Sequence, residues 1–126
     1  TRGFAQLGTG ISQSSGIFSF PSTGHYLIQF IALLTNSSTE ERFCTAFIEV
    51  TEDNSSFDKA NDTRTSLAGG SSQRNGSIHC SHVFDVTNTT NDKFKVGVDH
   101  SDSNTTIMGD SNQSETYIIV TKLADT

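Results

Sequence analysis

The segment from Gly16 to Phe30 constrains the fold of this chain more than any other. A short apolar run (17–20) leads into Pro21-Ser22-Thr23-Gly24, and the longest β-like apolar run of the sequence follows. Proline lacks an amide donor and fixes φ, so it belongs at a strand end or an edge. Glycine supplies the positive φ that a tight reversal often requires. The segment therefore predicts two strands joined by a turn, the second of them (25–35) central and buried on both faces.

Composition bounds the fold class and excludes several partners. The chain has 126 residues, enough for one domain with one core, and 18 Ser and 17 Thr favour strands and turns over helices. The net charge of −6 argues against a nucleic-acid partner, which needs a basic surface. No apolar run approaches the length of a membrane span, so membrane insertion is not expected. Because the first residue is Thr1 rather than Met, we expect a piece of a longer polypeptide.

Alternating apolar residues predict further strands after the first two. These strands cover 43–51, 64–67, 77–86, 94–98, 105–108 and 115–123. Short strands separated by turns, without helical periods, predict an all-β fold: one domain, a two-sheet antiparallel jelly-roll sandwich, with 25–35 and 115–123 both central. Residues 1–15 are expected to form an extended arm or the connection to a stem, and 16–126 the domain. The longest polar stretches, 54–76 and 100–114, are expected to be mainly loops.

The two cysteines, Cys44 and Cys80, each lie inside an alternating segment. A disulfide between them would require adjacent strands, and two buried thiols are the favoured interpretation, because a lone cysteine packs as a small apolar group.

Three motifs, in their order along the chain, resemble a known family. They are similar to strands of the tumour-necrosis-factor-like jelly roll, the fold of the complement component 1q heads. The motifs are Gly16-Ile17-Phe18 through Gly24-His25-Tyr26, then Asp92-Lys93-Phe94-Lys95-Val96, then Tyr117-Ile118-Ile119-Val120. Asn91 stands where that family usually has glycine. The final residues, 122–126, resemble the C-termini of fibre-like virion proteins of marine phages, which carry this domain last.

The resemblance implies a homotrimer and a non-enzymatic role in a virion. It implies the C-terminal knob of a fibre or appendage, which binds a glycan or protein of the host cell surface. A capsid decoration protein, which contacts other virion proteins, is the nearest alternative. A secreted, extracellular complement-like or cytokine-like ligand is the alternative from another class.

Candidate residues follow from aromatic strand faces and from polar loops. Aromatic residues on two-faced strands are the trimer-interface candidates: Tyr26, Phe43, Phe47 and Tyr117. Charged and polar residues of the long polar stretches are the receptor-loop candidates: Asn54, Asp58, Arg64, Arg74, His100, Asp102 and Asp110.

No motif indicates a cofactor or catalysis. Asp99, His100, Asp102 and Asp110 offer ligands for calcium, but their spacing matches no defined calcium loop, so no cofactor is expected. His79 and His82 lie three apart, on opposite faces of a strand. No nucleophile elbow, phosphate loop or pair of carboxylates on rigid strands is evident, so the chain is not expected to be an enzyme. Seven of the eight asparagines begin an Asn-x-Ser/Thr triplet, which indicates either glycan acceptors or the crowding of these residues into turns.

Overall fold

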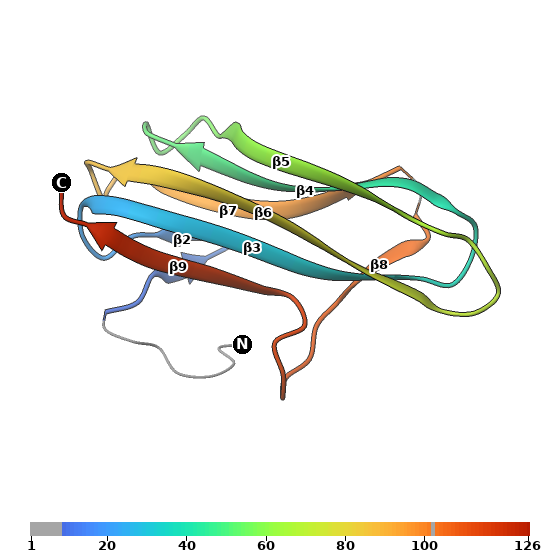
Figure 1. Ribbon diagram of the computed structural model, residues 1–126. Coiled ribbons are helices and arrows are strands. Elements are labelled where there is room, and N and C mark those ends of the chain that lie inside the picture. The colour runs from blue at the N-terminus through green and yellow to red at the C-terminus, as the bar shows by residue number, and fades with distance from the viewer. Residues whose placement is uncertain (1–8, 102) are drawn as a thin grey trace.

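The chain folds as a sandwich of two antiparallel sheets. The computed structural model describes residues 9–101 and 103–126, and these contain no helix (Figure 1). Sheet A has the order β1 (Ser12–Ser14), β2 (Ile17–Ser19), β7 (Lys93–His100), β4 (Glu41–Thr51), β5 (Asp58–Leu67). Sheet B consists of β6 (Arg74–Val86), β3 (Gly24–Asn36), β8 (Thr105–Met108) and β9 (Tyr117–Ala124). The predicted all-β, two-sheet, single-domain class is confirmed.

Strand β3 is the centre of sheet B, as predicted, but it is not buried on both faces, because its outward residues are only half-buried. It pairs with β6 along its whole length on one side, and with β9 and then β8 on the other. The prediction that the closing strand is also central is wrong, because within the described residues β9 pairs with β3 alone. Tyr117-Ile118-Ile119-Val120 is a continuous apolar run, but Tyr117 and Ile119 are 37% and 43% exposed. The run therefore combines a core face with an uncovered apolar face.

The Pro21–Gly24 turn carries the chain from sheet A to sheet B. Strand β2 ends at Ser19 in sheet A, and β3 begins at Gly24 in sheet B. Gly24 has a φ of +141°, which confirms the predicted positive φ. A Cβ at this position would lie 2.5 Å from the backbone oxygen of Ala124, so glycine also allows the end of β9 to approach.

The core lies between the inward faces of the two sheets. Alternate residues of β3 are buried and pack against alternate residues of β4 and β6. Phe20 and Phe94 join the sheets at one end, with 5.4 Å between their ring centroids, and Phe20 also contacts the Tyr26 ring at 4.7 Å. The apolar segment identified in the sequence thus supplies the aromatic end of the core.

Both cysteines are buried and unbonded, as favoured from the sequence. Cys44 lies on β4 and Cys80 on β6, in different sheets. Burial raises the pKa of the Cys80 thiol to about 11, and the nearby Asp62 carboxylate adds to this effect. Burial also raises the pKa of Cys44. Both thiols therefore stay protonated and unreactive near neutral pH.

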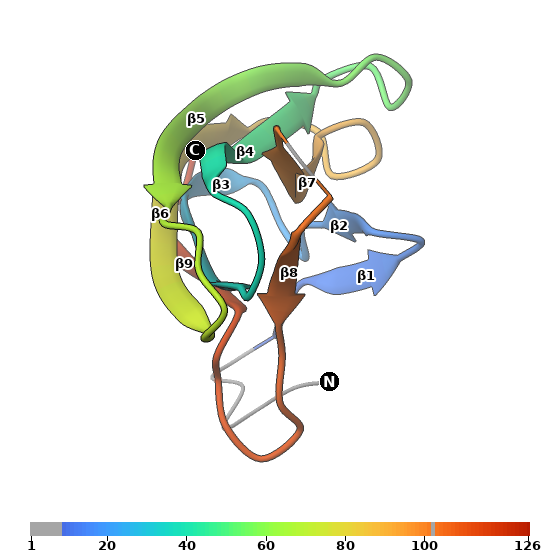
Figure 2. The same cartoon turned by 90° about the vertical axis from the view of Figure 1, so that its right-hand side faces the viewer.

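Strand β5 closes one flank of the sandwich (Figure 2). It extends sheet A but lies beside β6, where the Asn61 side-chain nitrogen donates to the Ser81 carbonyl and the Thr63 hydroxyl donates to the His79 carbonyl, both at 2.7 Å. The prediction that 54–76 is mainly loop is therefore wrong. Only a short strand at 64–67 was expected, because the inward residues of β5 are mostly polar and show no apolar alternation.

The first described strand, β1, lies inside the segment expected to be an arm. It pairs in an antiparallel hairpin with β2, so residues 12–14 belong to sheet A. All three of its residues are polar and exposed, which explains why hydrophobic periodicity did not reveal it. Residues 1–8 lie outside the described part of the chain.

Asp92 organises the turn between β6 and β7. It is 2% exposed, and its Oδ2 accepts the backbone N–H groups of Thr87 (2.7 Å) and Asn88 (2.8 Å). We expect Asp92→Ala to lower the free energy of unfolding by about 1–3 kcal/mol, because two amides lose a charged acceptor. Urea unfolding followed by circular dichroism measures the change. Asp99→Ala, an exposed carboxylate on β7, is the matched control, and equal losses in the two variants would contradict the prediction.

Candidate interaction surface

The outer face of sheet B carries an uncovered apolar surface, turned toward the viewer in Figure 1. It is made by the strand positions that alternate with the buried ones on β3, β6 and β9. We define the apolar face by these residues: Leu27, Ile31, Leu33, Val83, Tyr117 and Ile119.

The strand registers place these side chains beside one another. Val83 is opposite Leu27, and Tyr117 is opposite Ile31, whereas Ile119 is opposite the polar Gln29 that lies between Leu27 and Ile31 on β3. Val83 is 56% exposed, whereas the three β3 residues are half-buried between their neighbours. Contiguous apolar side chains on a sheet face are typical of a surface that another protein covers.

The outer face of sheet A, in contrast, places a cation of the same chain beside each of its two aromatic side chains, although Phe43 is still 43% exposed. The Lys59 ammonium lies 4.6 Å from the Phe47 ring centroid, and the Arg64 guanidinium lies 5.8 Å from that of Phe43. The Phe47 ring also lies against Gly97, where a Cβ would be 2.5 Å from its Cζ. Cations of the same chain thus contact the two aromatic residues that the sequence analysis assigned to a trimer interface.

The four predicted interface residues therefore lie in three places. Tyr26 is 3% exposed and packs in the core, where its hydroxyl donates to the Ser22 carbonyl at 3.0 Å. Phe43 and Phe47 lie on the outer face of sheet A. Only Tyr117 belongs to the apolar face. The sequence did show that Leu27, Ile31 and Leu33 share one face of their strand, but no aromatic residue marked that face on β3 or β6.

Three loops come together at one end of the sandwich, to the right in Figure 1. They connect β3 to β4, β5 to β6 and β7 to β8. The Gly70 N–H donates to the Ser38 carbonyl at 2.7 Å, and the Asn104 side-chain nitrogen donates to the Thr39 hydroxyl at 2.6 Å. We call this loop cluster the three-loop end.

A buried carboxylate, Glu41, holds part of the three-loop end. It is 0% exposed at the start of β4, and its two oxygens accept the hydroxyl groups of Ser101 and Thr105 (3.0 Å for Thr105). These hydroxyls lie at either end of the β7–β8 connection, so Glu41 fixes the path of that loop. Sequence reasoning missed Glu41, because one acid in a polar turn carries no distinguishing pattern.

The receptor-loop candidates are not gathered in one place. Arg74 and His100 lie at strand ends beside the three-loop end, whereas Asn54 and Asp58 lie toward the opposite end, after β4. Arg64 is in the middle of β5, and Asp110 is in the β8–β9 connection, which projects from the body (Figure 2). Asp102 lies outside the described residues.

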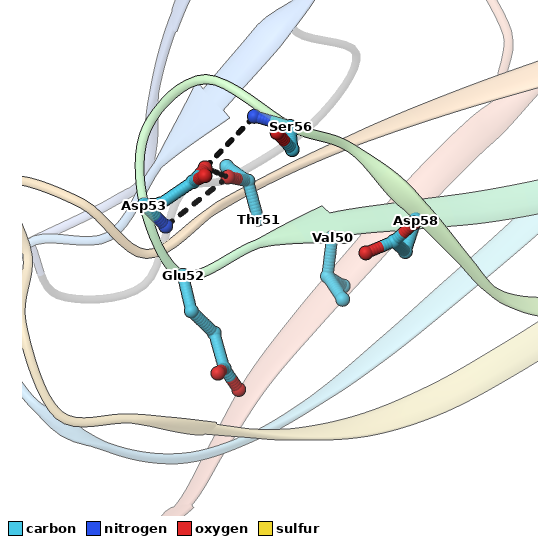
Figure 3. Close-up of a pocket in the computed structure, with 6 residues that line it drawn as sticks. All are labelled: Val50, Thr51, Glu52, Asp53, Ser56 and Asp58. Atoms are coloured by element: carbon cyan, nitrogen blue, oxygen red, sulfur yellow. Dashed lines mark hydrogen bonds between the residues drawn. The ribbon is translucent and has the colours of Figure 1, made fainter.

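An open depression near the opposite end is lined by acidic residues that do not converge. Its volume is about 400 Å³, and its lining includes Glu52, Asp53 and Asp58. Figure 3 shows Asp53 turned toward Thr51 and Ser56, with Glu52 and Asp58 pointing elsewhere. Hydrogen bonds from the backbone of Ser56 and Ser55 hold the Asp53 pKa well below its usual range. In the described part of the chain no three acidic, histidine or cysteine side chains form a metal-binding group, and the absence of a cofactor stays a prediction.

Three of the Asn-x-Ser/Thr asparagines serve the fold. Their side-chain nitrogens, the atoms that would carry a glycan, donate hydrogen bonds: Asn36 to the Thr39 carbonyl, Asn61 to Ser81 and Asn104 to Thr39. Asn36 is also 1% exposed. For these positions, turn and strand chemistry accounts for the triplet.

His82 faces the core side of β6, opposite to the exposed His79, as its position in the strand predicted. Burial lowers the pKa of His82 below the value of about 6.5 that holds in an unfolded chain. Below about pH 6.5 the unfolded chain therefore takes up a proton before the folded one does, and stability falls as the pH falls.

We expect His82→Gln to reduce the loss of stability at acidic pH. The measurement is the urea midpoint at about pH 7.5 and about pH 5.5 for the wild type and the variant. His100→Gln, at an exposed histidine, is the control and is expected to behave like the wild type. An unchanged pH dependence in His82→Gln would contradict the assignment.

No family model matches the chain, and no curated protein matches it significantly. The described residues contain no helix long and apolar enough to cross a membrane.

Proposed function

We propose that this chain is a non-enzymatic virion protein, the trimeric knob of a fibre or appendage that binds the host cell surface. The observation that carries the proposal is the apolar face, because its exposed Val83, Tyr117 and Ile119 lie side by side with the half-buried residues of β3. The resemblance to the tumour-necrosis-factor-like family supports a ring of three copies.

The low charge of this face favours a second copy of the chain as the partner that covers it. Its ionisable pair, His25 Nδ1 and Asp85 Oδ1 at 3.2 Å, lies at the end of the face where β3 begins and carries a single negative charge unless the histidine is protonated. The chain as a whole carries −6, so identical copies associate best through a face that is nearly free of charge. Closed cyclic symmetry lets each copy bury the same residues and leaves no apolar face uncovered.

The three-loop end is the proposed contact with the host. Its loops are polar, and their mutual hydrogen bonds together with Glu41 hold them in place without further subunits. Three copies of a weak site, carried on one rigid trimer, bind a surface of repeated glycans or proteins with increased avidity.

Two measurements test the proposal. Sedimentation equilibrium of the purified chain is expected to give three times the mass of one chain. Fluorescently labelled trimer is then incubated with intact bacteria and with purified phage capsids, and it is expected to bind cells and to compete with infection. Binding only to capsids would instead support a capsid decoration protein. A stable monomer would contradict the proposed trimer.

A further inference from the structure

We infer that acidic pH weakens the self-association of this chain through the apolar face, and that protonation of His79 is the cause. This inference rests on the proposed trimer and adds a regulation of the same surface. His79 is exposed on β6, opposite Ile31 of β3, which is in turn opposite Tyr117 of β9. A histidine thus stands in one row with two residues of the apolar face, across three strands.

The backbone holds this histidine in place. The Thr63 hydroxyl donates to the His79 carbonyl at 2.7 Å, so β5 fixes the strand at that residue. Ser77 and Ser81 are the neighbouring outward positions on β6, and neither can neutralise an imidazolium. A copy that covers Ile31 and Tyr117 also removes the His79 ring from water.

The other ionisable groups nearby do not compensate a proton on His79. On the outer face of sheet B these are His25, Asp85 and Tyr117, and Asp85 lies beside His25 at the far end of β3. Glu115 lies two residues before Tyr117, and its carboxylate accepts a hydrogen bond from the Gln113 side chain at 3.0 Å. On β5, beside β6, Asp62 is paired with Lys59 at 4.0 Å, and Arg64 carries positive charge. Strand β8 contributes no ionisable side chain.

The two histidines of this face therefore respond to acid in opposite ways. Protonation of His25 completes its ion pair with Asp85 and leaves the face neutral there. Protonation of His79 places an unpaired charge where the partner copy supplies apolar side chains, and desolvation opposes the charged form. Histidine changes charge near pH 6.5, so association is expected to weaken about tenfold or more from about pH 7.5 to about pH 5.5.

The experiment is sedimentation equilibrium across this pH range on the wild type, His79→Gln and the control His100→Gln, with circular dichroism to follow the fold. We expect the wild type and His100→Gln to dissociate in acid while folded, and His79→Gln to stay associated. If the wild type stays associated in acid, unfolds before it dissociates, or behaves like His79→Gln, the inference is overturned while the trimer stands. If the wild type is a monomer at every pH, the proposed function itself fails.

Discussion

Replacing Phe94 with alanine is expected to lower the free energy of unfolding by about 3–5 kcal/mol. Phe94 is 0% exposed, and its ring stacks on Phe18 with 4.8 Å between centroids and contacts Phe20. The removed ring leaves a cavity where the two sheets meet, and the paired strands around it cannot collapse to fill the space. Because domains of this size are stable by only about 5–15 kcal/mol, this loss is a large share of the total, and the variant is expected to unfold at a clearly lower urea concentration.

Phe43→Ala is the matched control, with the same chemical change at a residue that is 43% exposed. It removes the ring beside Arg64, and the expected loss is below about 1 kcal/mol. Urea unfolding followed by far-ultraviolet circular dichroism measures both variants. Similar losses for Phe43→Ala and Phe94→Ala would mean that Phe94 is not a central core residue.

Replacing Val83 with aspartate is expected to abolish self-association and leave the monomer folded. Val83 is 56% exposed in the single chain, so the substitution disturbs no core packing. In the trimer, a carboxylate at this position is buried without a partner, which costs several kcal/mol and corresponds to at least about a hundredfold weaker association.

Phe43→Asp is the control, because Phe43 is on the outer face of the opposite sheet. The Phe43→Asp variant is expected to stay trimeric if the apolar face is the interface. Sedimentation equilibrium with circular dichroism decides between the two faces. A trimer that survives Val83→Asp but not Phe43→Asp would return the interface to the aromatic face that the sequence suggested first.

Hydrophobic periodicity predicted the parts of this fold that have an apolar inward face. The strand 25–35 and the alternation of 43–51 and 77–86 were predicted within a few residues of β3, β4 and β6. Strands β1 and β5 have mainly polar residues, so they resembled loops in the sequence. The edge position of β9 could not be predicted, because a run that is apolar on both faces looks the same whether or not its outer face is covered.

The candidate surface was predictable only in part, for a related reason. Aromatic side chains drew attention to Phe43 and Phe47, but the cations beside them come from β5, the next strand, most of which had been expected to be a loop. Val83 joins Leu27 only through the pairing of β6 with β3. A sequence shows which residues share one face of a strand, and only the register shows which strands combine their faces.

The central position of β3 has a consequence for how the chain is made. This strand of 13 residues emerges early in synthesis, whereas its partners β6 and β9 begin at residues 74 and 117. Pairing between such distant segments is slow, because a long loop must close first. One edge of β3 therefore stays unpaired until β6 has been made, and the other until β8 and β9 follow, so a chain cut short before β9 is expected to aggregate.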